Sequence, residues 1–372
     1  AGIQYNTMIS EWTTLMNNEL KEALAGFKTA AEPIYCEPYG SGHINATYVC
    51  GLPGGRRYIL QKINHNTFKD VPKLMHNIAA VTSHMANKQS SMQTLTLVET
   101  LDGGSYLKND AGYWRMYDFV ENSLCLQLPE SNGDFYESAL AFGAFQQLLS
   151  DFPAERLYET IPDFHNTPDR YRKFREAVTS DPLNRAKDVR REIDFALSRE
   201  REMGMLQGLR DSGKLPVQVT HNDTKLNNVL FDKNTRKALC VIDLDTVMPG
   251  LSAYDFGDAI RFGATTALED ERELSKVAFR QDRYEAFAEG YIGACPGLTE
   301  AELETLPLGA KTMTIENGIR FLTDHILGDV YFSVHREGHN LDRCRTQFAL
   351  ASDMEKNWDK MRKAVEEVKC AF

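Results

Sequence analysis

The sequence predicts an α+β fold with two lobes: a small β-rich lobe over residues 1–120 and a larger, mainly helical lobe over residues 121–372. Two observations support this. Short apolar runs separated by glycine-containing turns fill much of the first 120 residues, and helical spacing of apolar residues dominates after Asn122. The chain is long enough for such a fold, and we place the lobe boundary within residues 117–122.

The β-rich lobe is predicted from strand-like runs and the turns between them. Residues 33–63 are expected to be largely β-structure, with a glycine-rich turn at residues 51–55. A second hairpin turn is predicted at Asp102-Gly103-Gly104. The predicted strands lie around residues 48–50, 58–60, 94–99 and 113–117.

Helices are predicted where apolar residues recur at steps of three and four. Residues 8–30 show this spacing, and a second helix is expected over residues 71–88. In the larger lobe, residues 315–336 are expected to form a largely buried helix, which Gly328 can break.

Composition restricts the classes of partner. The net charge of −11 argues against nucleic acid, and no apolar run approaches the length of a membrane span. The N-terminus lacks a basic segment followed by an apolar one, so no secretory signal is expected. Seven scattered cysteines without a C-x-x-C pair suit a reducing cytoplasm better than disulfides or a zinc site. We therefore expect a cytoplasmic protein with small-molecule partners.

The most informative segment is the run H-N-D-x-x-x-x-N beginning at His221, followed by I-D-x-D at the end of the next apolar run. Phosphoryl transfer from a Mg²⁺-bound nucleotide to a hydroxyl needs a carboxylate that orients the hydroxyl, and oxygen ligands for the metal. Asp223 fits the first role, and Asn228 and Asp243 fit the second. The alternative is a β-turn-β unit whose Asx residues only cap turns.

His221 and Asp245 belong to the same two motifs and have other expected roles. His221, two residues before Asp223, is expected to brace the loop by hydrogen bonds rather than take part in the chemistry. Asp245 shares a strand face with Asp243 if the strand continues, so it is either a second metal ligand or points away.

The order of these features resembles the aminoglycoside phosphotransferase and choline kinase superfamily, which has a protein-kinase-like fold. The likeness rests on H-N-D-x-x-x-x-N, I-D-L-D and the segment from Ala253 to Asp258. A closer likeness is to bacterial N-acetylhexosamine 1-kinases. It rests on residues 38–45, 60–64 and 161–167 and on the amino-acid sequence of residues 220–228. The superfamily resemblance implies that Asp255 supports the catalytic loop.

Nucleotide contacts are expected in the small lobe. Gly40 and Gly42 fit a turn whose backbone N–H groups cover phosphates, although an ordinary hairpin turn explains them as well. Lys62 is the candidate phosphate-pairing lysine, but the helix over residues 71–88 contains no Glu to pair with it. The backbone around Tyr117 and Val120 is expected to bind the adenine edge of ATP.

Acceptor contacts are expected in the larger lobe. If one helix covers residues 315–336, Arg320 and Tyr331 share a face about three turns apart and can grip a ligand between them. The alternatives are an ion pair of Arg320 with Asp324 and a core tyrosine. The resemblance favours sugar contacts for both, with His43 and Phe262 as further candidates; Phe164-His165 is expected to pack or cap.

The resemblance implies an ATP- and Mg²⁺-dependent kinase that phosphorylates the anomeric hydroxyl of an N-acetylhexosamine. One alternative is a kinase for choline, an aminoglycoside or an amino alcohol, and Arg320 argues against such cations if it lines the acceptor pocket. Another is a pseudokinase, against which the intact Asp223, Asn228 and Asp243 argue.

Overall fold

The computed structural model describes residues 18–40, 42 and 44–371, and its helices and strands form two compact units. The smaller unit contains the chain up to Ser123 together with Leu157–Ile161, and the larger contains Leu124–Arg156 and the chain from Pro162 onward. The predicted α+β class is confirmed, with a small antiparallel sheet in the first unit and mainly helices in the second. None of the described helices is both long and apolar enough to cross a bilayer.

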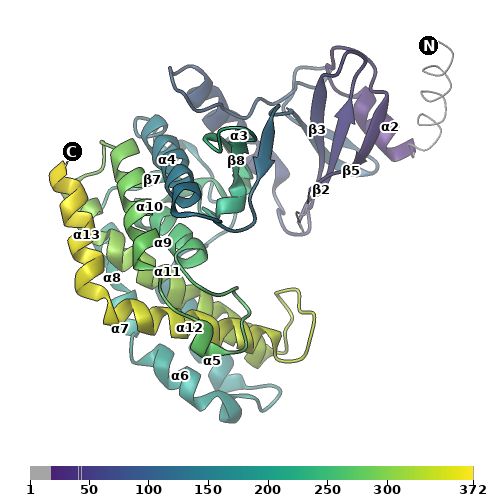
Figure 1. Ribbon diagram of the computed structural model, residues 1–372. Helices are drawn as coiled ribbons and strands as arrows, with labels where there is room; N and C mark the ends of the chain where they lie inside the picture. Colours follow the sequence, from purple (N-terminus) through teal and green to yellow (C-terminus); the bar gives the residue numbers. More distant parts are fainter. Residues whose placement is uncertain (1–17, 41, 43, 372) are drawn as a thin grey trace. The chain divides into compact units, whose positions relative to one another are not determined.

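The smaller unit is built on a five-stranded antiparallel sheet with the order β1-β2-β3-β5-β4. Helix α2 packs on one face of it, because Leu20 and Leu24 share an apolar cluster with Leu60, Trp114 and Met116 (Figure 1). The elements are α2 (Asn18–Ala25), β1 (Tyr35–Pro38), β2 (Ala46–Gly51), β3 (Arg57–Ile63), α3 (Val71–Ala86), β4 (Leu107–Asn109) and β5 (Gly112–Asp118).

Most of the elements predicted for this unit are present. Strands β2, β3 and β5 and helix α3 lie where the sequence predicted them. The predicted strand over residues 94–99 is wrong. This segment meets β5 through the isolated bridge Leu97↔Tyr117, because β4 pairs with the rest of that edge. The turn at residues 102–104 forms, but the strand that makes a hairpin with β5 is β4.

The first predicted helix is only partly described. Residues 8–17 of the predicted range lie outside the described residues, and α2 ends at Ala25 rather than at residue 30. The chain leaves the helix there because Phe27 forms a bridge with Thr100, and the Lys28 amide donates to the Glu99 carbonyl at 2.9 Å.

In the larger unit, helices surround α11, which packs against α5, α9, α12 and α13 (Figure 1). Two small sheets accompany them: β7 pairs with β10, and β6, β8 and β9 form a second sheet. The helices are α4 (Asn132–Leu148), α5 (Thr167–Ser180), α6 (Arg190–Leu197), α7 (Glu200–Met203), α8 (Met205–Asp211), α9 (Ser252–Gly263), α10 (Gln281–Ala294), α11 (Glu300–Leu327), α12 (His339–Lys356) and α13 (Trp358–Ala371). The strands are β6 (Ser123–Cys125), β7 (Gln218–Thr220), β8 (Val229–Asp232), β9 (Ala238–Val241) and β10 (Met248–Gly250).

Helices α9 and α11 approach each other at backbone distance through two glycines. A Cβ on Gly257 would lie 2.3 Å from the Gly309 carbonyl oxygen, and one on Gly309 would lie 2.2 Å from the Ala253 oxygen. Any side chain at either position would force the helices apart. This contact fixes the position of α9, which carries Asp255 and Asp258.

The helix predicted over residues 315–336 has different bounds. Helix α11 starts at Glu300 behind a Thr299 capping box and stops before Gly328, whose φ of 106° suits glycine. Beyond it, Asp324 accepts the backbone N–H groups of Val330, Tyr331 and Phe332. Tyr331 is therefore outside the helix, and the three-turn geometry expected for it is wrong.

Candidate active site

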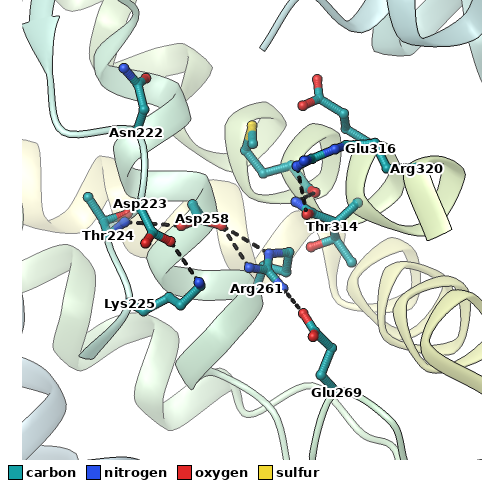
Figure 2. Close-up of polar contacts among 12 residues, drawn as sticks. Asn222, Asp223, Thr224, Lys225, Asp258, Arg261, Glu269, Thr314, Glu316 and Arg320 are labelled. Carbon is teal, nitrogen blue, oxygen red and sulfur yellow. Dashed lines mark hydrogen bonds and ion pairs between the residues drawn. The ribbon is translucent and has the colours of Figure 1, made fainter. Parts of the chain in front are cut away.

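The loop that contains His221, Asn222 and Asp223 connects β7 to β8, and two aspartates of α9 accept hydrogen bonds from its backbone. Asp255 accepts the backbone N–H of His221 at 2.8 Å on one oxygen and that of Asn222 at 2.7 Å on the other. Asp258, three residues along the same helix, accepts the N–H of Thr224 at 3.0 Å (Figure 2). Three backbone N–H groups of the loop, those of His221, Asn222 and Thr224, are thereby satisfied, which fixes the loop around Asp223.

These two aspartates differ in charge environment. Asp258 is paired with Arg261 at 2.9 Å, and Arg261 also pairs with Glu269. Asp255 forms no ion pair with Lys or Arg among the described residues. Burial raises its pKa to about 6, and the neighbouring His221, two backbone hydrogen bonds and His165 oppose that rise.

Both oxygens of Asp223 are engaged within the loop. The Lys225 ammonium lies 2.9 Å from one oxygen (Figure 2). The side-chain amide nitrogen of Asn228 donates to the other oxygen at 3.0 Å. Burial alone would raise the pKa of Asp223, but the charge and hydrogen bond of Lys225 outweigh it and hold that pKa below its usual value. The carboxylate is therefore ionised at neutral pH and ready to accept a hydrogen bond from a hydroxyl.

The contacts of His221 match the bracing role that the sequence predicted. Its Nδ1 accepts the Asp223 backbone N–H at 3.3 Å, and its Nε2 lies 2.8 Å from the Ile242 carbonyl oxygen. Because a carbonyl only accepts, Nε2 carries the proton, and the ring links the loop to the segment after β9.

Asn228 and Asp243 come from adjacent chain segments. Val229 faces Val241 in the β8–β9 pair, and the Ile242 amide donates to the Asn228 carbonyl at 2.9 Å, so Asp243 is one residue beyond that rung. The Asn228 amide nitrogen donates to both the backbone carbonyl and the carboxylate of Asp223, so the side-chain oxygen takes no part in these two contacts. Oxygen donors of this kind suit Mg²⁺, which usually takes only one or two protein carboxylates together with phosphates.

The expectation that Asp243 and Asp245 share a strand face is wrong. Strand β9 ends at Val241, Asp243 follows in a left-handed conformation with φ 58°, and Asp245 lies in a short 3₁₀ turn. Asp243 is exposed, whereas Asp245 is buried. Within the described residues, no group of three or more His, Cys, Asp or Glu side chains is arranged to hold a metal ion.

The predicted nucleotide-contacting residues of the smaller unit fall on its sheet. Gly40 and Gly42 lie in the connection between β1 and β2, and the φ of 77° at Gly40 favours glycine there. Lys62, on β3, forms an ion pair with Glu19 of α2 rather than with a residue of α3. This pair joins β3 to a helix that precedes it in the chain.

The two predicted adenine-binding residues are already engaged in part. Tyr117 is buried in β5, between its register partner Ile59 and the bridge to Leu97. The Val120 carbonyl accepts the Ser123 hydroxyl at 2.6 Å. A nucleotide would have to use the remaining backbone groups of this segment.

Of the predicted acceptor contacts, Arg320 and Tyr331 both lie near one aromatic ring. The Phe332 ring is 5.4 Å from the Arg320 guanidinium carbon and 4.8 Å from the Tyr331 ring. Asp324 does not pair with Arg320, because its oxygens accept the backbone of residues 330–332 and the Asn340 amide. The chain reverses at Gly328, so Arg320 and Tyr331 come near the Phe332 ring through this turn and not along one helix face as predicted.

The other two acceptor candidates are less informative. Phe262 is half-buried near the end of α9. His43 lies outside the described residues.

Sequence reasoning missed several residues of the site. Lys225 lies two positions after Asp223, and Asp258 lies three after Asp255 on one helix face, so spacing could have found both. Glu19 could not be paired with Lys62 from sequence, because 43 residues separate them.

A sequence profile described as the phosphotransferase enzyme family, APH, matches residues 36–291. The chain belongs to this phosphotransferase family. The match spans strands β2 to β5 of the smaller unit and the segment from His221 to Asp258.

Solved structures support the same fold. An aminoglycoside phosphotransferase from Alicyclobacillus acidocaldarius is similar with a TM-score of 0.63 and 13% identity, covering 93% of this chain and 96% of that one. A microcompartment-associated aminopropanol kinase reaches 0.59 with 16% identity, covering 92% and 98%. An amicoumacin kinase in complex with AMP-PNP and Ca²⁺ reaches 0.58 with 15% identity, covering 91% and 95%. At these identities the likeness establishes the kinase-like phosphotransferase fold.

Proposed function

We propose that this phosphotransferase is a sugar 1-kinase, which transfers the γ-phosphoryl group of ATP to the anomeric hydroxyl of an N-acetylhexosamine. The observation that carries the kinase assignment is the Asp223–Asn228 contact. One amide nitrogen donates to the carboxylate, which orients Asp223 and leaves the amide oxygen for a metal.

In this proposal Asp223 accepts the hydrogen bond of the acceptor hydroxyl and takes its proton as the new O–P bond forms, while the bond from the γ-phosphorus to the bridging oxygen breaks and ADP leaves. Asn228 and Asp243 would hold Mg²⁺, which neutralises phosphate charge when bound. Lys225 keeps Asp223 ionised. A structure similar in fold was solved with AMP-PNP and Ca²⁺, which supports a nucleotide and a divalent metal here.

The surroundings of Arg320 support a neutral, oxygen-rich acceptor. Among the described residues Arg320 forms no ion pair, and its guanidinium lies near the Phe164 and Phe332 rings. Nearby Arg170 has its pKa lowered by burial and by the charge of Arg320. Two neighbouring cations disfavour a quaternary ammonium or amino acceptor, whereas a guanidinium fork and aromatic faces suit a sugar ring.

The assay that tests this function measures ADP release with N-acetylglucosamine, N-acetylgalactosamine, choline, ethanolamine and an aminoglycoside as acceptors. We expect turnover with one or both hexosamines and none with their 1-O-methyl glycosides, because methylation removes the anomeric hydroxyl. Turnover of the cationic acceptors alone would refute the sugar assignment and favour an amino-alcohol kinase, the kind of activity named for one similar structure.

Variants then test the acceptor contacts. Arg320→Ala and Tyr331→Phe should raise the sugar KM while the ATP KM stays nearly constant, since both contacts would be made to the sugar. Arg199→Ala is the matched control, because Arg199 also lies over an aromatic ring, Phe195, and is paired with Glu355. It should lower the melting temperature without a selective effect on the sugar KM.

A further inference from the structure

Two histidines contact the peptide group that joins Asn222 to Asp223, one at its N–H and one at its carbonyl oxygen. The N–H of this peptide donates to His221 Nδ1 at 3.3 Å, and its carbonyl oxygen lies 3.2 Å from His165 Nε2. The plane of this peptide sets the direction in which the Cα–Cβ bond of Asp223 points. A rotation of the peptide would therefore move the Asp223 carboxylate.

His165 is itself held by a buried carboxylate. Its Nδ1 lies 2.9 Å from Glu316 Oε1, and the second Glu316 oxygen accepts the Thr167 hydroxyl. Glu316 is fully buried on α11 and His165 is 8% exposed. Both ring nitrogens of His165 face acceptors, so both hydrogen bonds form only when each nitrogen carries a hydrogen.

The residue before this peptide, Asn222, is held on both sides. Its φ of 64° lies in the left-handed region, which Asn adopts more readily than most non-glycine residues. Its N–H donates to Asp255, and its side-chain amide donates to the Thr246 carbonyl at 2.9 Å. The carbonyl of the residue lies 3.2 Å from His165 Nε2, so removal of that contact frees one side of the peptide.

Glu316 and His165 are also adjacent to the candidate acceptor contacts. Arg320 lies one turn after Glu316 on α11, and its guanidinium carbon is 5.6 Å from the ring of Phe164, the neighbour of His165 in sequence. Figure 2 shows Glu316 and Arg320 on the same helix, with Asp223 in the loop that faces it. Glu316 and His165 thus connect α11, the helix that carries Arg320, with the Asn222–Asp223 peptide, which orients Asp223.

We infer that His165, held by Glu316, is a positioning residue that fixes the Asn222–Asp223 peptide and thereby the direction of the Asp223 carboxylate toward the acceptor hydroxyl. This inference rests on the proposed function, in that Asp223 is the carboxylate that receives the hydroxyl. His165 touches neither substrate nor metal in this role. Its effect belongs in kcat, since a small misplacement of a reacting group lowers the rate with little change in nucleotide binding.

Two substitutions at His165 separate positioning from general stability. The amide nitrogen of Gln can take the place of His Nε2 and keep a donor to the Asn222 carbonyl, whereas that of Asn takes the place of Nδ1 and keeps only the Glu316 contact. His165→Asn should lower kcat about 10- to 100-fold with the ATP KM unchanged, and His165→Gln should restore kcat to within a few-fold of the parent. Equal kcat values in the two variants would overturn the inference.

A matched control and a second variant protect this comparison against misfolding. His325 is also buried on α11, at 9% exposure, and its Nδ1 has no partner among the described residues; His325→Asn should alter melting and leave kcat within about twofold. If His165→Asn does not fold, Glu316→Gln keeps the buried volume while it removes the charge behind His165. It should lower kcat at constant ATP KM, and a kcat equal to the parent's would overturn the inference.

A substrate-free measurement distinguishes failure of this inference from failure of the sugar assignment. Hydrogen–deuterium exchange of the peptide that covers residues 221–226 should be faster in His165→Asn than in the parent, and close to parental in His165→Gln. A parent enzyme that phosphorylates no hexosamine would count against the proposed function only. Parental exchange in His165→Asn would count against the positioning role, whatever the acceptor is.

Discussion

The buried carboxylate of Asp255 should give the protein a pH-dependent stability of a definite sign. Burial raises the pKa of Asp255 from 3.8 to about 6 in the folded state. A carboxyl whose pKa is raised by folding contributes stability that is present below pH 4 and is lost as the pH rises through 6. At about 1.36 kcal/mol for each pKa unit, the gap amounts to roughly 3 kcal/mol, of which about 2 kcal/mol falls between pH 4.5 and 7.

The perturbation is Asp255→Asn, which keeps the shape of the side chain and removes its ionisation. Asn has one acceptor oxygen, so it can serve only one of the N–H groups of His221 and Asn222, and the other is left buried without a partner. That loss costs about 1–3 kcal/mol. The substitution should therefore destabilise the protein most at pH 4.5, and the destabilisation should shrink by about 2 kcal/mol at pH 7.

Denaturant unfolding of parent and variant at intervals from pH 4.5 to 7 measures this difference, from which the titrating groups that do not interact with Asp255 cancel. Asp134→Asn is the control: Asp134 is also buried and accepts backbone N–H groups, but Arg236 pairs with it. Burial would raise the pKa of Asp134, and Arg236 holds it below its usual value instead, so its contribution is complete above pH 4. The Asp134→Asn difference should stay flat across this range. A flat or growing difference for Asp255→Asn would refute the argument.

Three further predictions concern the chemistry. Asp223→Asn should lower kcat by about 10²–10⁴-fold with nucleotide binding intact, and turnover within a few-fold of the parent would exclude it as the base. Asp243→Ala should abolish activity and weaken Mg²⁺-dependent ATP binding, so an unchanged affinity by calorimetry would remove it from the metal site. Lys225→Met removes the charge that holds the pKa of Asp223 down, so the acidic limb of the kcat/KM profile should move to higher pH. A limb that stays in place would show that Lys225 does not control this ionisation.

Much of the fold could be predicted because its signals are local. The strands β2, β3 and β5 follow from short apolar runs bounded by glycine turns, and α3 follows from helical spacing. The errors occurred where tertiary contacts override local preference. Residues 94–99 have strand-forming composition, yet most of the β5 edge is taken by β4.

The candidate site divides in the same way. Asp223, Asn228 and Asp243 could be chosen from sequence because their proposed roles depend on order and spacing within one loop and the strand after it. The relation between Arg320 and Tyr331 could not be derived, because Asp324 collects three backbone N–H groups after Gly328 and folds that segment back. The side-chain positions calculated from helical spacing apply only as far as the helix continues.

By itself, then, the sequence determined the α+β class, most of the elements of the smaller unit and the position of the loop that we propose carries the chemistry. These depend on periodicity, on glycine and on the spacing of a few polar residues. Only the tertiary structure decided how that loop is held. The hydrogen bonds from the loop backbone to Asp255 and Asp258 depend on the position of α9, which packs on α11 through two glycines. The pairing of Glu316 with His165 joins residues 151 positions apart. Hydrogen bonds over such separations leave no local pattern, because packing of whole helices brings the groups together.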